Sequence, residues 1–296
     1  MSSERNCKRR LGRASNRAHD ELTTAGRNSC MTDQINILGR FCGKRDVESL
    51  DRSELKAKYG IGKADVMVLF GGSVLAGGDV LAEAVKKEVA ETYIIVGGAG
   101  HTTDTLRDLV HREYPAIETA GLPEAEIFQS YLREIHGCQA DYLEKESTNC
   151  GNNITNLLAL LKKHHIPFDS IILCQDATMQ ARMDAGLRRY APDDVQIINF
   201  ASYAATVCAD ASGLAYAEKI HGMWDVDRYI SLLMGEIPRL TDDENGYGPN
   251  GKQFIAHVDI PENVKEAFTQ LRIHYGRRIR EANPAFASEE YIKQTS

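Results

Sequence analysis

The chain has 296 residues, 43% of them hydrophobic, and a formal net charge of -7. This composition supports a packed core and is too hydrophobic for disorder, and the length fits one large domain with at most a small appendage. Residues 1–30 carry seven basic and three acidic side chains, so the other 266 residues carry a net charge of -11. Because residues 31–296, the acidic body of the chain, are negatively charged, we do not expect them to bind the phosphate backbone of a nucleic acid.

No apolar run approaches the roughly 18 residues that a membrane span requires, so none is predicted. Seven cysteines form an odd set without a C-x-x-C pair, which is typical of reduced thiols and predicts a cytoplasmic protein without a disulfide frame or zinc site. Residues 1–30 are interpreted as a disordered basic leader, with a targeting or nucleic-acid-binding arm as the alternative.

The chain then divides into three predicted parts. Residues 31–63 form an N-terminal helical extension of two helices, the second of which begins at Ser53 and ends at Gly60. Residues 64–202 form an α/β domain. Residues 203–296 form a helical cap packed on the same core, with helices over 224–240 and 261–281 and a turn-rich loop at 242–251.

Within the α/β domain, short apolar runs alternate with helical patterns. The predicted strands cover residues 64–70, 92–96, 141–144, 170–175 and 195–200. The predicted helices between them cover residues 79–91, 102–112, 123–136, 152–165 and 178–190. This alternation indicates βαβ units, so the predicted fold class is α/β, a Rossmann-like open, mostly parallel sheet with helices on both faces.

Ligands of open α/β sheets bind beyond the carboxyl ends of the strands. Glycines or polar residues follow all five predicted strands. The candidate ligand-binding residues are Gly71, Gly72, Ser73, Gly97, Gly98, Gly100, His101, Thr102, Glu144, Ser147, Asn149, Asn153, Gln175, Asp176, Thr178 and Arg182. The glycine clusters match neither a dinucleotide fingerprint nor a phosphate-binding P-loop, and either one alone equally predicts a tight strand-to-helix turn.

The segment 144–153 is the most informative of these loops. An N-cap by Asn149 or Ser147 needs one polar residue, whereas this segment also carries Glu144, Thr148, Asn152 and Asn153, so a ligand-facing loop is favoured over an elaborate cap. Cys150 is either a nucleophile or a small buried thiol. Arg182 either binds an anion or lies on a solvated face, and His101 is a candidate acid or base without a partner for metal ligation.

Together these loops resemble the YdcF/SanA/ElyC-like family, a domain of unknown function, and in particular its YdcF branch, over residues 64–200. The matching motifs are Gly71-Gly72, Gly97-Gly98-Ala99-Gly100-His101-Thr102, Glu124-Ala125, Glu144-x-x-Ser147-Thr148-Asn149-Cys150-Gly151-x-Asn153 and Gln175-Asp176-x-Thr178-Met179-Gln180. The resemblance implies a Rossmann-like fold and binding of S-adenosylmethionine, without a metal.

The chain departs from the family pattern in three places. Asn152 stands where the family usually has an acidic residue, and Cys150 stands where it usually has threonine. Residues 178–181 replace a common His-Met-x-Arg, with Arg182 one place later. The chain also lacks the membrane anchor of SanA- and ElyC-like members, so their role at the cell envelope transfers poorly.

We therefore expect a small-molecule-binding protein with S-adenosylmethionine or a related adenosyl ligand at the carboxyl edge. Gly72 and Gly98 would let backbone approach the ligand, and Glu144 or Asp176 would accept hydrogen bonds from ribose hydroxyls or an ammonium group. Asn149 and Asn153 would orient the ligand. Arg182 would pair with a carboxylate. The acidic body suggests a ligand that is not polyanionic.

Two other functions stay open at this point. The chain could be a hydrolase or transferase acting on a phosphorylated or glycosyl-linked cell-envelope metabolite, with Glu124, Glu144 and His101 as candidate acid and base groups. It could also be a regulatory scaffold that binds another protein through residues 203–296.

Overall fold

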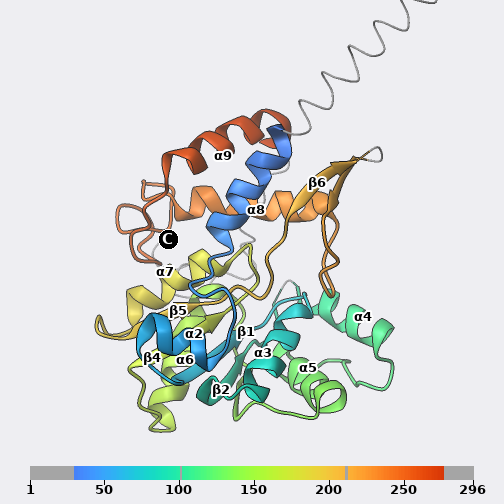
Figure 1. The fold of residues 1–296 in the computed structure, drawn as a ribbon, viewed down its shortest axis with the longest axis vertical. Helices are drawn as coiled ribbons and strands as arrows, with labels where there is room; N and C mark the ends of the chain where they lie inside the picture. The colour runs from blue at the N-terminus through green and yellow to red at the C-terminus, as the bar shows by residue number, and fades with distance from the viewer. Residues whose placement is uncertain (1–29, 101, 211–212, 277–296) are drawn as a thin grey trace, which may run out of the picture.

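A computed structural model of the chain describes residues 30–100, 102–210 and 213–276. Five strands form one sheet in the order β3-β2-β1-β4-β5 (Figure 1). They are β1 (Ala64–Phe70), β2 (Ala90–Val96), β3 (Tyr142–Glu144), β4 (Ser170–Cys174) and β5 (Gln196–Asn199). Every neighbouring pair is parallel. The predicted α/β fold class with a Rossmann-like parallel sheet is therefore confirmed.

Helices cover both faces of this sheet because its central strands are apolar on both sides. Met67 and Leu69 of β1 pack into the hydrophobic cluster on one face, whereas Val66 and Val68 pack into the cluster on the other. The first face is covered by α2 (Arg52–Tyr59), α3 (Ala76–Lys86), α4 (Thr103–Glu113) and α5 (Glu124–Tyr131). The second is covered by α6 (Cys150–Lys163) and α7 (Gln180–Tyr190). Continuous apolar strands are expected for a sheet buried in this way.

Several predicted helix boundaries move by a few residues. The predicted helix over 79–91 ends at Lys86, because Glu88 turns at a φ of 52° and β2 begins at Ala90. The predicted helix over 123–136 is α5 followed by a π-helical segment, Leu132–His136. Gly60 ends α2 in the left-handed conformation with a φ of 76°, as its position predicted.

The part predicted as a helical cap after residue 202 also contains two strands that the sequence did not reveal. Residues Val207–Asp210 (β6) and Gly213–Tyr216 (β7) form an antiparallel hairpin. Only Val207 is buried in these two short strands, so they carry no alternating apolar pattern that the sequence could reveal. The two predicted cap helices are present as α8 (Val226–Leu240) and α9 (Glu262–Tyr275). The predicted end of the second helix, at residue 281, lies outside the described residues.

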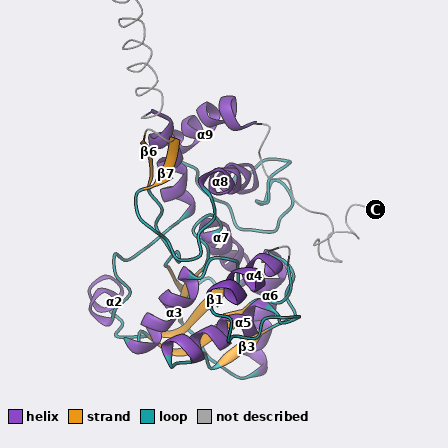
Figure 2. Cartoon of the chain, turned by 90° about the vertical axis from the view of Figure 1, so that its right-hand side faces the viewer, coloured by secondary structure: helices purple, strands orange, loops and turns teal. Residues whose placement is uncertain are grey.

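The cap forms a second hydrophobic cluster with an N-terminal helix over residues 30–42 and with Val74, Ala177 and Ala201, which follow strands of the sheet. Ile35, Leu38 and Cys42 of that helix are fully buried among side chains of α8 and α9. Figure 2 shows α8, α9 and the hairpin above the sheet and its helices. The residues before position 30, which hold nearly all of the predicted leader, lie outside the described part. Within the described ranges, no helix is both long and apolar enough to cross a membrane.

Candidate functional site

A cavity of about 790 Å³ lies at the carboxyl ends of the strands, where the cap meets the sheet. We call its lining residues between 71 and 190 the sheet wall and those between 224 and 255 the cap wall. The predicted residues that line it are Gly71, Gly72, Ser73, Gly97, Gly98, Gly100, Thr102, Glu124, Ser147, Asn149, Asn153, Gln175, Asp176 and Arg182. Glu144 and Thr178 do not line it, and His101 lies outside the described residues.

The glycine turns after β1 and β2 enclose the side chain of Glu124 at the start of α5. A Cβ atom on Gly71 would lie 2.5 Å from Glu124 Oε2, and one on Gly97 would lie 3.1 Å from Glu124 Cβ. Two hydroxyl groups donate to Glu124 Oε1, from Thr102 at 3.0 Å and from Thr103 at 2.9 Å. The glycines therefore make room for a buried carboxyl group beside the cavity.

Burial raises the pKa of Glu124, and the hydrogen bonds from Thr103 and Thr102 and the charge of Arg107 offset part of that rise. Desolvation disfavours the charged form of a carboxyl group, so Glu124 holds its proton to a higher pH than an exposed glutamate does. A carboxyl group with this property on a cavity wall is suited to acid or base chemistry.

Gly72 and Gly98 differ in what surrounds them. A Cβ on Gly98 would lie 2.1 Å from the carbonyl oxygen of Ser147. The packing of the loop after β2 against the loop after β3 is therefore sufficient to require glycine at this position. A Cβ on Gly72 would meet only Gln175 Oε1, at 3.8 Å. Gly72 therefore leaves space in which a ligand could approach the backbone as predicted, whereas Gly98 allows two loops to pack against each other.

The loop over residues 144–153 is both a cap and a cavity wall. Asn149 accepts hydrogen bonds from the amides of Gly151 and Asn152 at 2.9 and 3.0 Å, and the side chain of Asn152 accepts from the amide of Asn149 at 2.9 Å. This capping box starts α6 at Cys150, two residues before the predicted start. Asn149 and Asn152 also line the cavity, so the same segment is a helix cap and part of the cavity wall.

Glu144, a predicted ligand acceptor and acid/base candidate, is engaged by its own loop. Its Oε1 accepts hydrogen bonds from the amide of Glu146 at 2.8 Å and from Asn156 Nδ2 at 2.9 Å. It is buried, and it is not part of the cavity lining. These contacts hold the loop in place through Oε1, whereas Oε2 is buried without a hydrogen-bond partner in the described part of the chain.

Gln175 and Asp176, directly after β4, present unpartnered polar atoms. Gln175 Nε2 and Asp176 Oδ2 are buried and have no hydrogen-bond partner in the described part of the chain. The other oxygens are used: Gln175 Oε1 accepts from the amide of Asp176 at 2.6 Å, and Asp176 Oδ1 accepts from Thr178 and from the hydroxyl of Tyr203 at 3.0 Å. Burial raises the pKa of Asp176 against these hydrogen bonds. Each of these two residues thus keeps one unused polar atom, a donor on Gln175 and an acceptor on Asp176, and both residues line the cavity.

Arg182, a predicted anion ligand, is committed to a protein carboxylate. Its guanidinium forms two hydrogen bonds with Glu236 of α8, one of them 3.0 Å from Nη2 to Oε1. The side chains of Arg182 and Glu236 are 12% and 2% exposed, so the alternative of a solvated surface arginine is wrong. Arg239 also contacts Glu236, at 3.5 Å. This buried group joins α7 of the sheet region to α8 of the cap.

The sequence did not reveal the cap wall. It brings aromatic and apolar side chains and further cations to the cavity, and these residues are Trp224, Arg228, Leu232, Arg239, Tyr247, Lys252, Phe254 and Ile255. Trp224 Nε1 donates to Ser73 Oγ at 2.9 Å, and the guanidinium of Arg228 lies 5.3 Å from the Trp224 ring. The aromatic residues Tyr247, in the turn-rich loop, and Phe254, just after it, were the available signal, because exposed loops seldom need two of them.

The charges that line the cavity as a whole change the expectation of a ligand that is not polyanionic, which was drawn from the acidic body. Glu124 and Asp176 are the acidic residues in the described lining, whereas five lining residues are basic: Arg182, Arg189, Arg228, Arg239 and Lys252. The cavity therefore suits a ligand that carries both a cationic or hydroxyl-rich part and an anionic part.

The side chains that commonly ligate metals form no metal-binding cluster in the described residues. Within the described ranges, no group of three or more histidine, cysteine, aspartate or glutamate side chains is placed to hold a metal ion. A comparison with models of known protein families finds no family that matches this chain.

Proposed function

We propose that this protein binds S-adenosylmethionine or a related adenosyl ligand in the cavity between the sheet wall and the cap wall. The ligand class comes from the resemblance to YdcF-like proteins. The observation that carries the proposal is the unpartnered pair Gln175 Nε2 and Asp176 Oδ2. Leaving a buried polar group unsatisfied costs about 1–3 kcal/mol, so such a pair on a cavity wall favours a ligand that supplies an acceptor and a donor.

The size and chemistry of the cavity support the same ligand. Its volume of about 790 Å³ lies within the range of roughly 300–1,000 Å³ that is usual for small-molecule sites. An adenosyl ligand offers ring nitrogens, an amino group and ribose hydroxyls to Gln175 and Asp176. The methionine part carries a sulfonium and an ammonium beside a carboxylate, which matches a lining of both charge signs.

Titration calorimetry with S-adenosylmethionine is the direct test. We expect binding to the wild-type protein and an affinity loss of about tenfold or more in Asp176→Asn, which turns the unpartnered acceptor into a donor while Oδ1 can still accept from Thr178 and Tyr203. The matched control is Asp184→Asn, because Asp184 is also buried but pairs with Lys44 and Arg188 outside the cavity. Absence of heat at millimolar ligand in folded wild-type protein would exclude this function.

S-adenosylhomocysteine and adenosine separate the parts of the ligand. The first lacks the sulfonium charge and the second lacks the amino-acid part. If Gln175 and Asp176 bind the adenosyl group, Asp176→Asn lowers the affinity for all three ligands by a similar factor. A loss restricted to S-adenosylmethionine would place the sulfonium, and not the nucleoside, near Asp176.

A hydrolase or transferase is the second candidate, and Glu124 is the observation that favours it. This buried carboxyl group lines the cavity and has a raised pKa. A screen of phosphorylated and glycosyl-linked substrates would detect turnover. Loss of that turnover in Glu124→Gln but not in Glu144→Gln would assign an acid or base role to Glu124, since Glu144 does not line the cavity. Turnover that survives both changes would exclude these residues from the chemistry.

A further inference from the structure

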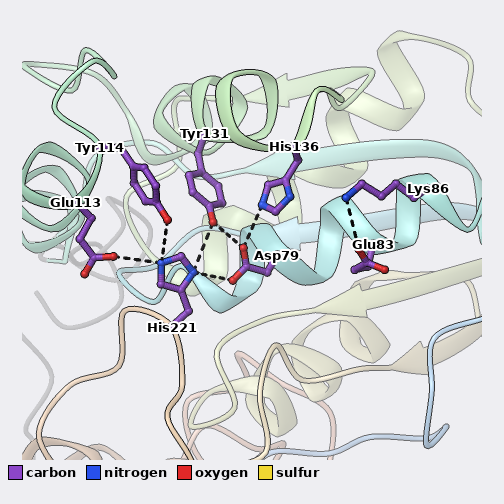
Figure 3. Close-up of polar contacts among 8 residues, drawn as sticks. All are labelled: Asp79, Glu83, Lys86, Glu113, Tyr114, Tyr131, His136 and His221. Atoms are coloured by element: carbon purple, nitrogen blue, oxygen red, sulfur yellow. Dashed lines mark hydrogen bonds and ion pairs between the residues drawn. The ribbon is translucent and has the colours of Figure 1, made fainter.

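A polar cluster outside the cavity joins the cap to the α/β part of the molecule (Figure 3). Its centre is His221, which lies in the segment over residues 217–225 that leads from β7 to α8; we call it the return segment. His221 Nδ1 lies 2.7 Å from Asp79 Oδ2 on α3, and Nε2 lies 3.2 Å from Glu113 Oε2 at the end of α4. Both ring nitrogens face carboxylate oxygens, and both can donate hydrogen bonds only when the imidazole is protonated. The geometry therefore fits an imidazolium held between two carboxylates.

Other titratable groups complete the cluster. The hydroxyl of Tyr131 on α5 donates to Asp79 Oδ1 at 2.6 Å, and His136 Nε2, in the π-helical segment, lies 3.1 Å from the same oxygen. Arg112 contacts Glu113 at 3.6 Å, and the ion pair of Lys86 with Glu83 lies farther along α3. The hydroxyl of Tyr114 lies 3.3 Å from His221 Nε2.

The position of Tyr114 shows what loss of the proton would change. In the neutral imidazole, Nδ1 can still donate to Asp79, but Nε2 then carries a lone pair. That lone pair can accept a hydrogen bond from Tyr114, whereas it opposes the carboxylate oxygen of Glu113. Deprotonation therefore keeps the contact with α3 and removes the contact with Glu113 on α4.

The return segment connects this cluster to the cavity within four residues. The carbonyl of His221 accepts from the amide of Ala76 at 3.1 Å. Gly222 follows with a φ of 73°, and a Cβ there would lie 2.8 Å from the amide nitrogen of Leu75. Trp224 then donates to Ser73, and both residues line the cavity. The return segment thus lies directly along the chain that follows β1.

We infer that His221 is a positioning residue for the cavity. Its protonated imidazole ties the return segment to α3 and α4 and so keeps Trp224 against Ser73. With a neutral imidazole at His221 the contact with Glu113 is lost, and Trp224 is held less firmly on the cavity wall. The hold of the His221 cluster on Trp224 does not depend on the ligand, whereas the effect of this hold on ligand affinity rests on the proposed function.

Trp224 reports on this arrangement directly, because it is the single tryptophan of the chain. The experiment is acrylamide quenching of tryptophan fluorescence in the full chain between about pH 5 and pH 8, the range in which histidine is the side chain that ordinarily titrates. We expect the wild-type quenching constant to rise and the emission maximum to shift to longer wavelength as the pH increases. Circular dichroism at each pH checks that the protein stays folded.

Three variants separate the charge of His221 from other causes. His221→Gln removes the charge and should give the alkaline wild-type signal at every pH, whereas His221→Lys keeps a cation and should give the acidic signal throughout. Glu113→Gln, at a side chain that is 35% exposed, should reduce the pH response without disturbing the fold. His111→Gln is the matched control, because His111 is exposed on the same helix and outside the cluster, and it should follow the wild-type curve.

Ligand affinity provides the second measurement. We expect the Kd for S-adenosylmethionine to increase about fivefold between pH 6 and pH 8 in the wild type, equivalent to ~1 kcal/mol for a partly exposed ion pair, and to change less in His221→Gln. Quenching of Trp224 that does not vary with pH, or a variation that survives in His221→Gln, would overturn the inference. If S-adenosylmethionine gives no heat at either pH, the proposed function fails, and the quenching of Trp224 still decides the role of His221.

Discussion

The two walls of the cavity are held in place by different physical means. The sheet wall consists of loops at strand ends, fixed by backbone contacts such as the close approach of Gly98 to Ser147 and by the capping box of Asn149 and Asn152. The cap wall is positioned by side chains, namely the buried pair of Arg182 and Glu236, Trp224 on Ser73, and the partly exposed cluster around His221. Backbone packing leaves little freedom, whereas partly exposed ion pairs are weak and depend on pH. We therefore expect the sheet wall to set which ligand group is recognised and the cap wall to adjust how firmly the ligand is held.

The largest effect is expected at the buried ion pair that joins the two walls. Glu236→Gln leaves the guanidinium of Arg182 buried with its charge no longer matched, and loss of one partner of such a pair costs about 3–5 kcal/mol. The free energy of unfolding from urea titration measures it. The control is Glu262→Gln on α9, where an exposed pair with Lys265 should contribute less than about 1 kcal/mol. Equal losses in both variants would mean that the walls are joined by something other than this pair.

The second prediction compares two glycines of the sheet wall. Gly98→Ala places a Cβ against the carbonyl oxygen of Ser147, so we expect it to lower the free energy of unfolding by about 1–3 kcal/mol through overpacking. Gly72→Ala has room for its Cβ and should leave stability nearly unchanged, while it weakens ligand binding. Thermal and urea unfolding, with calorimetric titration of S-adenosylmethionine, separate the two. A stable Gly98→Ala variant would remove the claim that backbone packing fixes this wall.

The sheet wall could be predicted from the sequence because a parallel sheet obeys a simple geometric rule. The apolar runs marked the strands, and the polar residues that follow them had to meet at one edge. Gly71, Gly97 and Gln175 are brought together in this way although they are far apart in the chain. What the rule cannot supply is how each side chain is used: Glu144 stands at the end of β3, but it does not line the cavity and its Oε1 holds its own loop.

The cap wall follows no such rule. Trp224 lies on an irregular segment, and Tyr247 and Phe254 lie in the irregular stretch between α8 and α9, so no periodicity indicates which way they face. The partner of Arg182 is Glu236, 54 residues later in the chain, and no local pattern links the two. The hairpin of β6 and β7 buries only Val207, which explains why it was missed. Tertiary contacts between separate elements determine this half of the site.

The third prediction concerns pH and the buried Glu124. Because its pKa is raised in the folded protein, the folded state binds the proton more tightly than the unfolded state does. Stability is therefore lost as the pH rises from the unfolded value, about 4.3 for glutamate, through the folded pKa. Glu124→Gln lacks this loss, so its free energy of unfolding relative to the wild type should increase with pH over that window and then level off.

Urea titrations at several pH values between about 4 and 8 measure this difference. The control is Glu126→Gln on the same helix, since the carboxylate of Glu126 forms an ion pair with Lys145 at 2.6 Å and should not show the same increase. A relative stability of Glu124→Gln that falls with pH would mean that Thr102, Thr103 and Arg107 outweigh burial at this carboxyl group.

The smallest effect is expected from two N-caps, one beside each wall. Asn149 starts α6 and Asp225 starts α8, where it accepts from the amide of Arg228 at 2.8 Å. Loss of an N-cap costs about 1 kcal/mol, so Asn149→Ala and Asp225→Ala should destabilise the protein to a similar extent. Asn149 lines the cavity and Asp225 does not, so only Asn149→Ala should also lose affinity when binding is measured well below the melting temperature. Equal losses of affinity would show that Asn149 acts through the stability of α6, and the loop over residues 144–153 would then be a cap without a direct role in binding.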